Sequence, residues 1–278
     1  MFIYAFIPNL ILISIFLGAA LGCVSSYAVV RKWSFIGDII SHSALPGVVY
    51  MFLATQTQNY ILLIIGGGVS ALLSSLISFY IQKNTLLPRD SGFAIILSWF
   101  FSLGIIGMTI IQKISISGQS MINNFIYGNI VTFASGKILF YIIFSILFLI
   151  IFFALLNIQK SVAFDIVYTQ IRYKYMFLLE TILLISSVFI IVIGLQVVGI
   201  LLMGALIIAP GSFAKMICGS YLKMIFCSMI LTILSFLFGV SIGIYFSHIP
   251  SGPIIALIPV CSCILMVLYY KIIELKKN

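Results

Sequence analysis

Charged side chains are scarce in this chain. Asp, Glu, Lys and Arg make up only 7% of the 278 residues, and just five of them are acidic. A water-soluble domain needs far more charge on its surface, so the composition excludes a soluble globular protein. Hydrophobic residues reach 63% of the sequence. We therefore predict an all-α, polytopic helical membrane protein that forms a single transmembrane domain over residues 1–278.

Motifs of nucleotide hydrolysis and of nucleophilic catalysis are also missing. No GxxxxGK[ST] phosphate-binding loop occurs, so the chain by itself is not expected to hydrolyse ATP. Its only histidines, His42 and His248, fall at opposite membrane depths in the topology predicted below, which disfavours an intramembrane hydrolase. The five cysteines show no metal-binding spacing and are predicted to be small packing residues without disulfides. We expect no enzyme and no permanently bound cofactor.

Long apolar runs are what the sequence does have. A helix needs roughly 20 apolar residues to cross a bilayer. The first run carries no basic residue ahead of it and is too long for a signal-peptide core, so it is predicted to be an uncleaved span. We place nine spans near residues 8–30, 34–54, 60–82, 92–112, 135–157, 176–194, 195–214, 223–246 and 254–273. Only Gly194, Leu195 and Gln196 separate the sixth and seventh, so eight spans are the alternative.

The basic residues predict the orientation. With nine spans and the N-terminus outside, every Lys and Arg except Lys113 and Lys137 falls on the cytoplasmic side. This is the asymmetry of the positive-inside rule, and the opposite orientation would invert it. The positive-inside topology thereby explains the net charge of +9. We expect the chain to contact the lipid membrane and to have no nucleic-acid partner.

The segment GDIISHSALPG, residues 37–47, places Asp38 and His42 four residues apart within an apolar span. Residues at this spacing project from one side of a helix. Ionisable groups at membrane depth usually mark a substrate or ion pathway. Carboxylate oxygen and imidazole nitrogen together suit zinc, manganese or iron. The pair predicts a path for a divalent metal ion; the alternative is that Asp38 caps the helix or pairs with Arg31 or Lys32.

Three neighbours of this pair add to the prediction. Pro46 removes the helical hydrogen bond to the carbonyl of His42, which frees that oxygen to face an ion. Gly37 and Gly47 bracket the pair and permit close backbone approach. One Asp and one His give only two ligands, and zinc usually takes four. A second copy related by a two-fold axis would supply the other two.

Other polar residues have less specific interpretations. His248 lies in the predicted outer turn SHIPSGP, either at the mouth of the pathway or as an ordinary loop histidine. Residues 157–175 mix apolar and charged side chains and predict an amphipathic helix at the membrane surface, as an anchor or as a docking element. Asp90 and Asp165 are expected to be solvated or to cap helices. Glu180 is expected near Lys174 or Tyr173, without an assigned function.

The order of these segments resembles the permease subunits of zinc, manganese and iron ABC importers. The resemblance covers nearly the whole chain. It starts at RKWSFIGDIISHSALPGVVYMFL, which shows a basic residue, Gly-Asp, a small residue, Ser-His and Leu-Pro-Gly in the family's order. It continues through PRDSGFAIILSWFFSLGIIGM, FIYGNI, AFDIVYTQ, LQVVGILLMGALIIAPGSFAKMI and IPSGPIIALI. The first and fifth segments are the most specific. The element from Ser161 to Arg172 departs from the family in having Thr169 and Ile171 where small residues are common.

The resemblance implies one half of a two-fold importer pore in the cytoplasmic membrane. Its partners would be a second copy of the chain, a cytoplasmic ABC ATPase subunit that hydrolyses ATP, and an extracytoplasmic metal-binding protein. Asp38 and His42 would contact the transported ion, zinc, manganese or iron. Phe164 and Asp165 would belong to an ATPase-coupling segment at about 158–174. A proton-coupled secondary carrier, and an assembly protein that moves nothing, remain the alternatives.

Overall fold

The computed structural model of the chain describes residues 2–33, 35–57, 59–114, 125–126, 128, 138–245 and 250–277. These residues are helical, with turns and short connections, and contain no strand, so the predicted all-α class is confirmed. The helices are α1 (Phe2–Val30), α2 (Ile36–Thr55), α3 (Tyr60–Asn84), α4 (Arg89–Ile114), α6 (Ile138–Ala154), α7 (Leu156–Phe164), α8 (Ile166–Arg172), α9 (Met176–Val198), α10 (Ile200–Ile217), α11 (Tyr221–Tyr245) and α12 (Ser251–Lys277).

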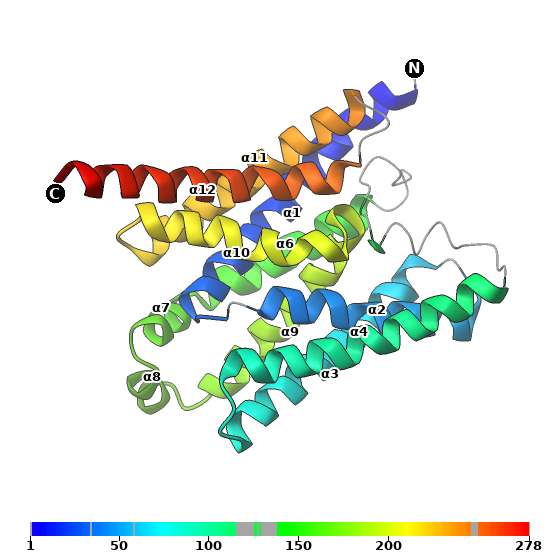
Figure 1. Cartoon of the computed structure of the whole chain (residues 1–278), viewed down its shortest axis with the longest axis horizontal. Helices are drawn as coiled ribbons and strands as arrows, with labels where there is room; N and C mark the ends of the chain where they lie inside the picture. Colours follow the sequence, from blue (N-terminus) through cyan, green and yellow to red (C-terminus); the bar gives the residue numbers. More distant parts are fainter. Residues whose placement is uncertain are drawn as a thin grey trace.

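Each of the nine predicted spans corresponds to a helix. Eight helices are long and apolar enough to cross a membrane on their own, and α6 with α7 gives a ninth that bends by 55° at Leu155. The described helices thus give eight spans, or nine if the bent pair crosses the membrane as one. The two termini lie at opposite ends of the long axis in Figure 1, the arrangement that nine passes along that axis produce.

The predicted boundary between the sixth and seventh spans was wrong. Gly194, Leu195 and Gln196 lie within α9, and the chain breaks at Gly199 instead. Gly199 has φ 95° and ψ 153°, a backbone conformation that is essentially restricted to glycine. A single glycine such as Gly194 is tolerated inside a helix, so the composition of residues 194–196 did not locate the turn.

The helices form two groups with α9 and α10 between them. On one side α1 packs against α11 and α10, and α12 packs against α10 and α11. On the other side α2 packs against α3 and α4, and α10 also contacts α2. Figure 1 shows α2, α3 and α4 at the lower edge of the view and α11 and α12 at the upper edge. Helix α10 thus joins the group that carries Asp38 and His42 to the rest of the bundle.

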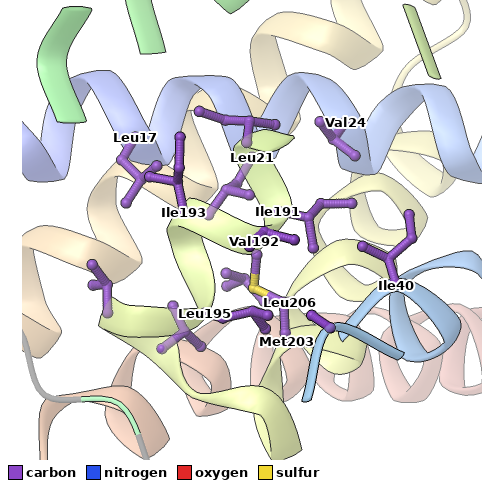
Figure 2. Close-up of a cluster of buried hydrophobic side chains, with 14 of the residues drawn as sticks. Leu17, Leu21, Val24, Ile40, Ile191, Val192, Ile193, Leu195, Met203 and Leu206 are labelled. Carbon is purple, nitrogen blue, oxygen red and sulfur yellow. The ribbon is translucent and has the colours of Figure 1, made fainter. Parts of the chain in front are cut away.

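The core is centred on the second half of α9. Every residue from 190 to 200 is buried, so this part of the helix contacts protein on all sides, as a helix that is apolar all round should. Figure 2 shows Ile191, Val192 and Ile193 packed against side chains of α1, with Met203 and Leu206 of α10 on the other side. The labelled residues from α1 and α2 are Leu17, Leu21, Val24 and Ile40.

Glycines let two helix pairs approach closely. A Cβ added to Gly22 of α1 would lie 2.7 Å from the backbone of Met229 in α11. A Cβ added to Gly47 of α2 would overlap the backbone of Gly66 in α3. Small residues at such contacts are typical of membrane helix packing. Gly22 thus brings α1 against α11, and Gly47 brings α2 against α3.

The connection between α6 and α9 differs from its prediction. One amphipathic helix was expected over residues 157–175, but the structure has two short helices, α7 and α8, that break at Asp165. Asp165 has an extended backbone, and its Oδ1 accepts hydrogen bonds from the backbone N–H groups of Val167 (2.8 Å) and Tyr168 (3.2 Å). This N-cap starts a new helix, so the carboxylate that was expected either to be solvated or to cap a helix is a cap.

Candidate functional site

Asp38 and His42 lie on the same side of α2, one turn apart. Both are half-buried, whereas the residues between them, Ile39, Ile40 and Ser41, are buried against the bundle. The Ser41 hydroxyl donates to the backbone carbonyls of Gly37 and Asp38, so it is satisfied within the helix. As predicted from their spacing, Asp38 and His42 project from the same side of α2, and this side is partly open.

Asp38 is held against α10. A Cβ built at Gly204 would overlap the Asp38 carboxylate, so the absence of a side chain at Gly204 makes room for that group. The backbone of α2 is also close to α10 here, since a Cβ at Gly37 would lie 3.0 Å from the Ile207 side chain and 3.3 Å from the Gly204 Cα. Because Gly204 has no side chain, the Asp38 carboxylate can extend from α2 to the surface of α10.

His42 contacts α4 through its ring. The imidazole meets the ring of Phe101 edge to face, with centroids 5.0 Å apart and an interplanar angle of 86°. Its Nδ1 is buried and has no hydrogen-bond partner among the described residues. A buried ring nitrogen without a partner is uncommon in folded proteins and indicates a missing ligand, ion or water. Phe101 fixes the ring while Nδ1 stays unpartnered.

The alternative role for Asp38, pairing at the inner end of the helix, does not fit the contacts. Arg31 instead forms an ion pair with Glu180 of α9, with Nη2 and Oε1 3.0 Å apart. Lys32 is exposed. In the described part of the chain, the Asp38 carboxylate has no hydrogen bond, and no ion pair links it to His42. The expected partners of Glu180, Lys174 or Tyr173, were wrong because α1 and α9 are neighbours in the fold.

Three neighbours of the pair on α2, Gly37, Pro46 and Gly47, have different surroundings. Pro46 lies inside α2, four residues after His42, and its ring nitrogen cannot donate to the His42 carbonyl. Gly47 packs against Gly66 of α3, so its close contact is with that helix. Gly37 faces α10. The three positions differ in what they contact, and the proline is the one that frees a polar backbone atom next to His42.

The remaining candidate residues lie elsewhere. Phe164 ends α7 and is 90% exposed, next to the Asp165 cap, at the end of the bundle opposite the N-terminus. Arg172 of α8 stacks on the rings of Tyr168 and Tyr173. Its Nη1 donates a hydrogen bond to the Tyr168 hydroxyl, which raises the pKa of Arg172. His248 lies outside the described residues.

Sequence reasoning missed two residues that shape the site. Gly204 and Phe101 both come from segments far from Asp38 in the chain, and both contact the pair directly. Each falls inside a segment that resembles the importer permeases: Gly204 in LLMGALIIAPG and Phe101 in SWFFSLGIIG. Nothing in their local pattern indicates which helix they face, because that depends on how α4 and α10 pack on α2.

The described residues of one copy of the chain offer too few side-chain ligands for a metal ion. Within the described residues, no three His, Cys, Asp or Glu side chains come together in a group that could hold a metal. All five cysteines are free, as predicted. The pair thus supplies a carboxylate oxygen and an imidazole nitrogen, and zinc usually takes four such ligands. A metal ion bound by this pair would need further donors from the backbone, from water or from a second molecule.

Comparison with known proteins identifies the family. Residues 3–270 match the ABC 3 transport family. The zinc transport system membrane protein TroC of Treponema pallidum is 29% identical over 259 residues, which cover 91% of this chain and 85% of that protein. A probable iron transport system membrane protein of Haemophilus influenzae is 28% identical over 273 residues, covering 97% and 95%.

The fold is also known from a solved structure. PsaBC from Streptococcus pneumoniae in complex with Fab contains a chain that superposes with a TM-score of 0.80 at 24% identity. The match covers 94% of this chain and 90% of that one, so the arrangement of the helices is shared over almost the full length. With a family match over nearly the whole sequence and a shared helical fold, the chain belongs to the ABC 3 transport family.

Proposed function

We propose that this chain is the permease subunit of an ATP-binding-cassette importer that moves a divalent transition metal ion across the cytoplasmic membrane by alternating access. The observation that carries the proposal is the pair on α2, Asp38 and His42: both side chains are half-buried in a membrane span, and the buried Nδ1 of His42 has no hydrogen-bond partner among the described residues. Membership of the ABC 3 transport family supports the transport role. The metal is the transported substrate.

The partly open face of α2 favours a pore made by two copies. A carboxylate that faced lipid would be strongly unfavourable, so another polar surface has to cover it. In a two-fold dimer, the same face of a second copy would cover it and would add a second Asp38 and a second His42. Two carboxylates and two imidazoles provide four ligands, the number that zinc prefers. The freed carbonyl of His42 and water would complete a larger shell for manganese or iron.

The donor types set the class of metal. Imidazole nitrogen and carboxylate oxygen bind zinc, manganese and iron in proteins, whereas a set of oxygens alone would favour calcium or magnesium. Relatives matched by this chain are named as zinc, manganese and iron transport system membrane proteins. The proposal therefore includes these three metals. The choice among them would rest on the protein that delivers the ion.

The partners follow from what the chain lacks and exposes. Without a phosphate-binding loop it needs a separate ATPase subunit. The exposed Phe164 and the capped start of α8 give that subunit a defined surface at the end of the bundle that carries most of the basic residues, which is the predicted cytoplasmic end. An extracytoplasmic metal-binding protein would dock at the other end. ATPase closure would move α7 and α8, and through them the spans around Asp38.

Uptake of zinc, manganese or iron into proteoliposomes tests the proposal. The chain is reconstituted with and without its ATPase and binding protein, with ATP on the ATPase side and no proton gradient. We expect uptake only with both partners and ATP, and its loss in Asp38→Asn and His42→Ala. Asp90→Asn is the matched control, since Asp90 is an exposed carboxylate at the start of α4.

Three results would contradict the proposal. Uptake by the chain alone, driven by a pH gradient, would make it a proton-coupled carrier. Full uptake by Asp38→Asn would show that the transported metal does not depend on the Asp38 carboxylate. If no set of partners and no gradient produced transport while the protein stayed folded, the chain would be an assembly protein, and the ABC proposal would fail.

A further inference from the structure

The bend between α6 and α7 is bridged by the side chain of Gln159. The two helices meet at Leu155 at an angle of 55°. Gln159 lies in α7 and is only 4% exposed. Its Nε2 donates to the backbone carbonyl of Phe152 in α6, at 2.9 Å, so this hydrogen bond crosses the bend. The last four carbonyls of a helix lack a partner within it, and Gln159 provides a donor to one of them.

The other end of the same amide is tied to α11. Gln159 Oε1 accepts a hydrogen bond of 2.9 Å from the hydroxyl of Tyr221. Tyr221 is the first residue of α11, 62 positions further along the chain. One buried amide therefore uses both its nitrogen and its oxygen and joins α6, α7 and α11. Breaking either bond would leave a buried polar group without a partner, which is unfavourable, so these three helices are expected to keep their contact when they move.

Other connections between the α7–α8 segment and the spans are limited. Apart from each other, α7 and α8 have their main packing partner in α6. Gln159 and Val162 are the buried side chains of α7. In α8 most apolar side chains are exposed, namely Ile166, Val167, Tyr168 and Ile171. A segment with so little packing could turn about Leu155, and the hydrogen bonds of Gln159 oppose that turn.

Helix α11 leads from Tyr221 toward the Asp38–His42 pair. It packs against α1, α10 and α12. Helix α10 in turn packs against α2, and its Gly204 lies directly beside the Asp38 carboxylate. A displacement of α11 therefore reaches the pair through one intervening helix. Helix α6, which Gln159 also holds, packs against α1 and α9.

We propose that Gln159 is a positioning residue that makes the α6–α7 bend rigid and ties it to α11, so that a displacement of α7 and α8 moves the spans instead of folding the bend. This role rests on the proposed function, because the ATPase subunit would supply the displacement at the exposed Phe164. Gln159 is buried and acts on the transported ion only through α6 and α11.

The number of metal ions taken up per ATP hydrolysed tests this role. Both rates are measured on the same proteoliposomes, which contain the chain with its ATPase and binding protein, using the metal that the wild-type complex transports. Tyr221→Phe removes one hydroxyl, and Gln159→Leu removes both hydrogen bonds while nearly keeping the side-chain volume. Tyr269→Phe is the matched control, because Tyr269 is exposed on α12 and its hydroxyl is not bonded to Gln159.

We expect Tyr221→Phe to lower the ratio by up to about 5-fold and Gln159→Leu by up to about 30-fold. These are the factors by which the loss of one and of two hydrogen bonds shifts an equilibrium, here between the rigid and the folded bend. Tyr269→Phe should keep the wild-type ratio. Incomplete folding of a variant lowers both rates together, so the ratio reports coupling. In the double variant, Tyr221→Phe should add nothing to Gln159→Leu, because their shared bond is already lost.

The wild-type ratio in every variant would overturn the role of Gln159 and leave the proposed function intact. Loss of the ATPase from the purified variant complexes would assign Gln159 to the docking surface and would also overturn it. Additive effects of Tyr221→Phe and Gln159→Leu would show that the two residues act separately, with the same consequence. A wild-type complex without ATP-dependent uptake would refute the proposed function, and the coupling role with it.

Discussion

Gly204→Ala is the substitution that most directly tests the geometry of the α2 site. The alanine Cβ would occupy the space that the Asp38 carboxylate now fills. The carboxylate is the free end of a rotatable side chain, so it can turn away while the two helix backbones keep their positions. The substitution thus changes the direction of a proposed ligand without removing it. Gly37 also contacts α10 at this level, and its backbone packing is unchanged by the new methyl group.

The magnitudes separate effects on folding from effects on the site. Overpacking of this kind lowers stability by about 1–3 kcal/mol. Replacing a helical glycine with alanine returns about 0.5–1 kcal/mol, so the folded state should survive. Changes to groups that orient a metal ligand reduce metal affinity by about 10- to 100-fold. We therefore expect a large loss of transport from a protein whose unfolding transition shifts only slightly.

The assay is ATP-dependent metal uptake in the reconstituted complex, together with thermal unfolding of the same preparations. Gly194→Ala is the matched control, since its Cβ would meet the mobile end of Met203 at 2.8 Å, in the core and away from Asp38. Gly194→Ala should retain uptake. Wild-type uptake by Gly204→Ala at all metal concentrations would refute the argument that the carboxylate acts from its position beside α10.

Three further substitutions test the packing that supports the site. Glu180→Gln leaves Arg31 without its ion-pair partner. Because both side chains are partly exposed, the free energy of unfolding measured by denaturation should fall by only about 1–3 kcal/mol. Replacing both residues with Met should restore most of this loss. Asp165→Ala removes the N-cap of α8 and should destabilise that helix by about 1 kcal/mol, seen as faster amide exchange; Asn should preserve the cap. Gly22→Ala forces α1 away from the backbone of α11 and should lower the melting temperature, while Gly219→Ala, with nothing within 4 Å, should not. An unchanged melting temperature for Gly22→Ala would contradict the close contact.

Much of the fold was predictable because a bilayer restricts the choices. Each span must be a long apolar helix, since no water is present to satisfy the backbone. The nine runs could therefore be located from composition, and the basic residues could be assigned to one end. The predictions that were wrong concern two local features. The turn at Gly199 depends on one backbone conformation, and the break at Asp165 depends on one capping carboxylate. Neither changes the hydrophobic pattern, so that pattern could not reveal them.

The candidate site was also predictable only in part. The spacing of Asp38 and His42 on one helix is a property of the sequence, because residues four apart in a helix share a face. Their surroundings are not. Gly204 lies 166 positions after Asp38, and Arg31 pairs with Glu180 instead of the nearer Asp38.

The sequence by itself determined the membrane class, the helices and the two ionisable residues that the helix presents together. Only the tertiary structure decided which groups those residues meet. It placed Phe101 against the imidazole, Gly204 beside the Asp38 carboxylate, and no hydrogen-bond partner from the described residues at Nδ1 of His42. The physical reason is that apolar spans pack on one another through shape, by close contacts such as Gly22 on α11 and Gly47 on Gly66. These contacts fix helix neighbours, and a one-dimensional pattern of hydrophobicity does not encode them.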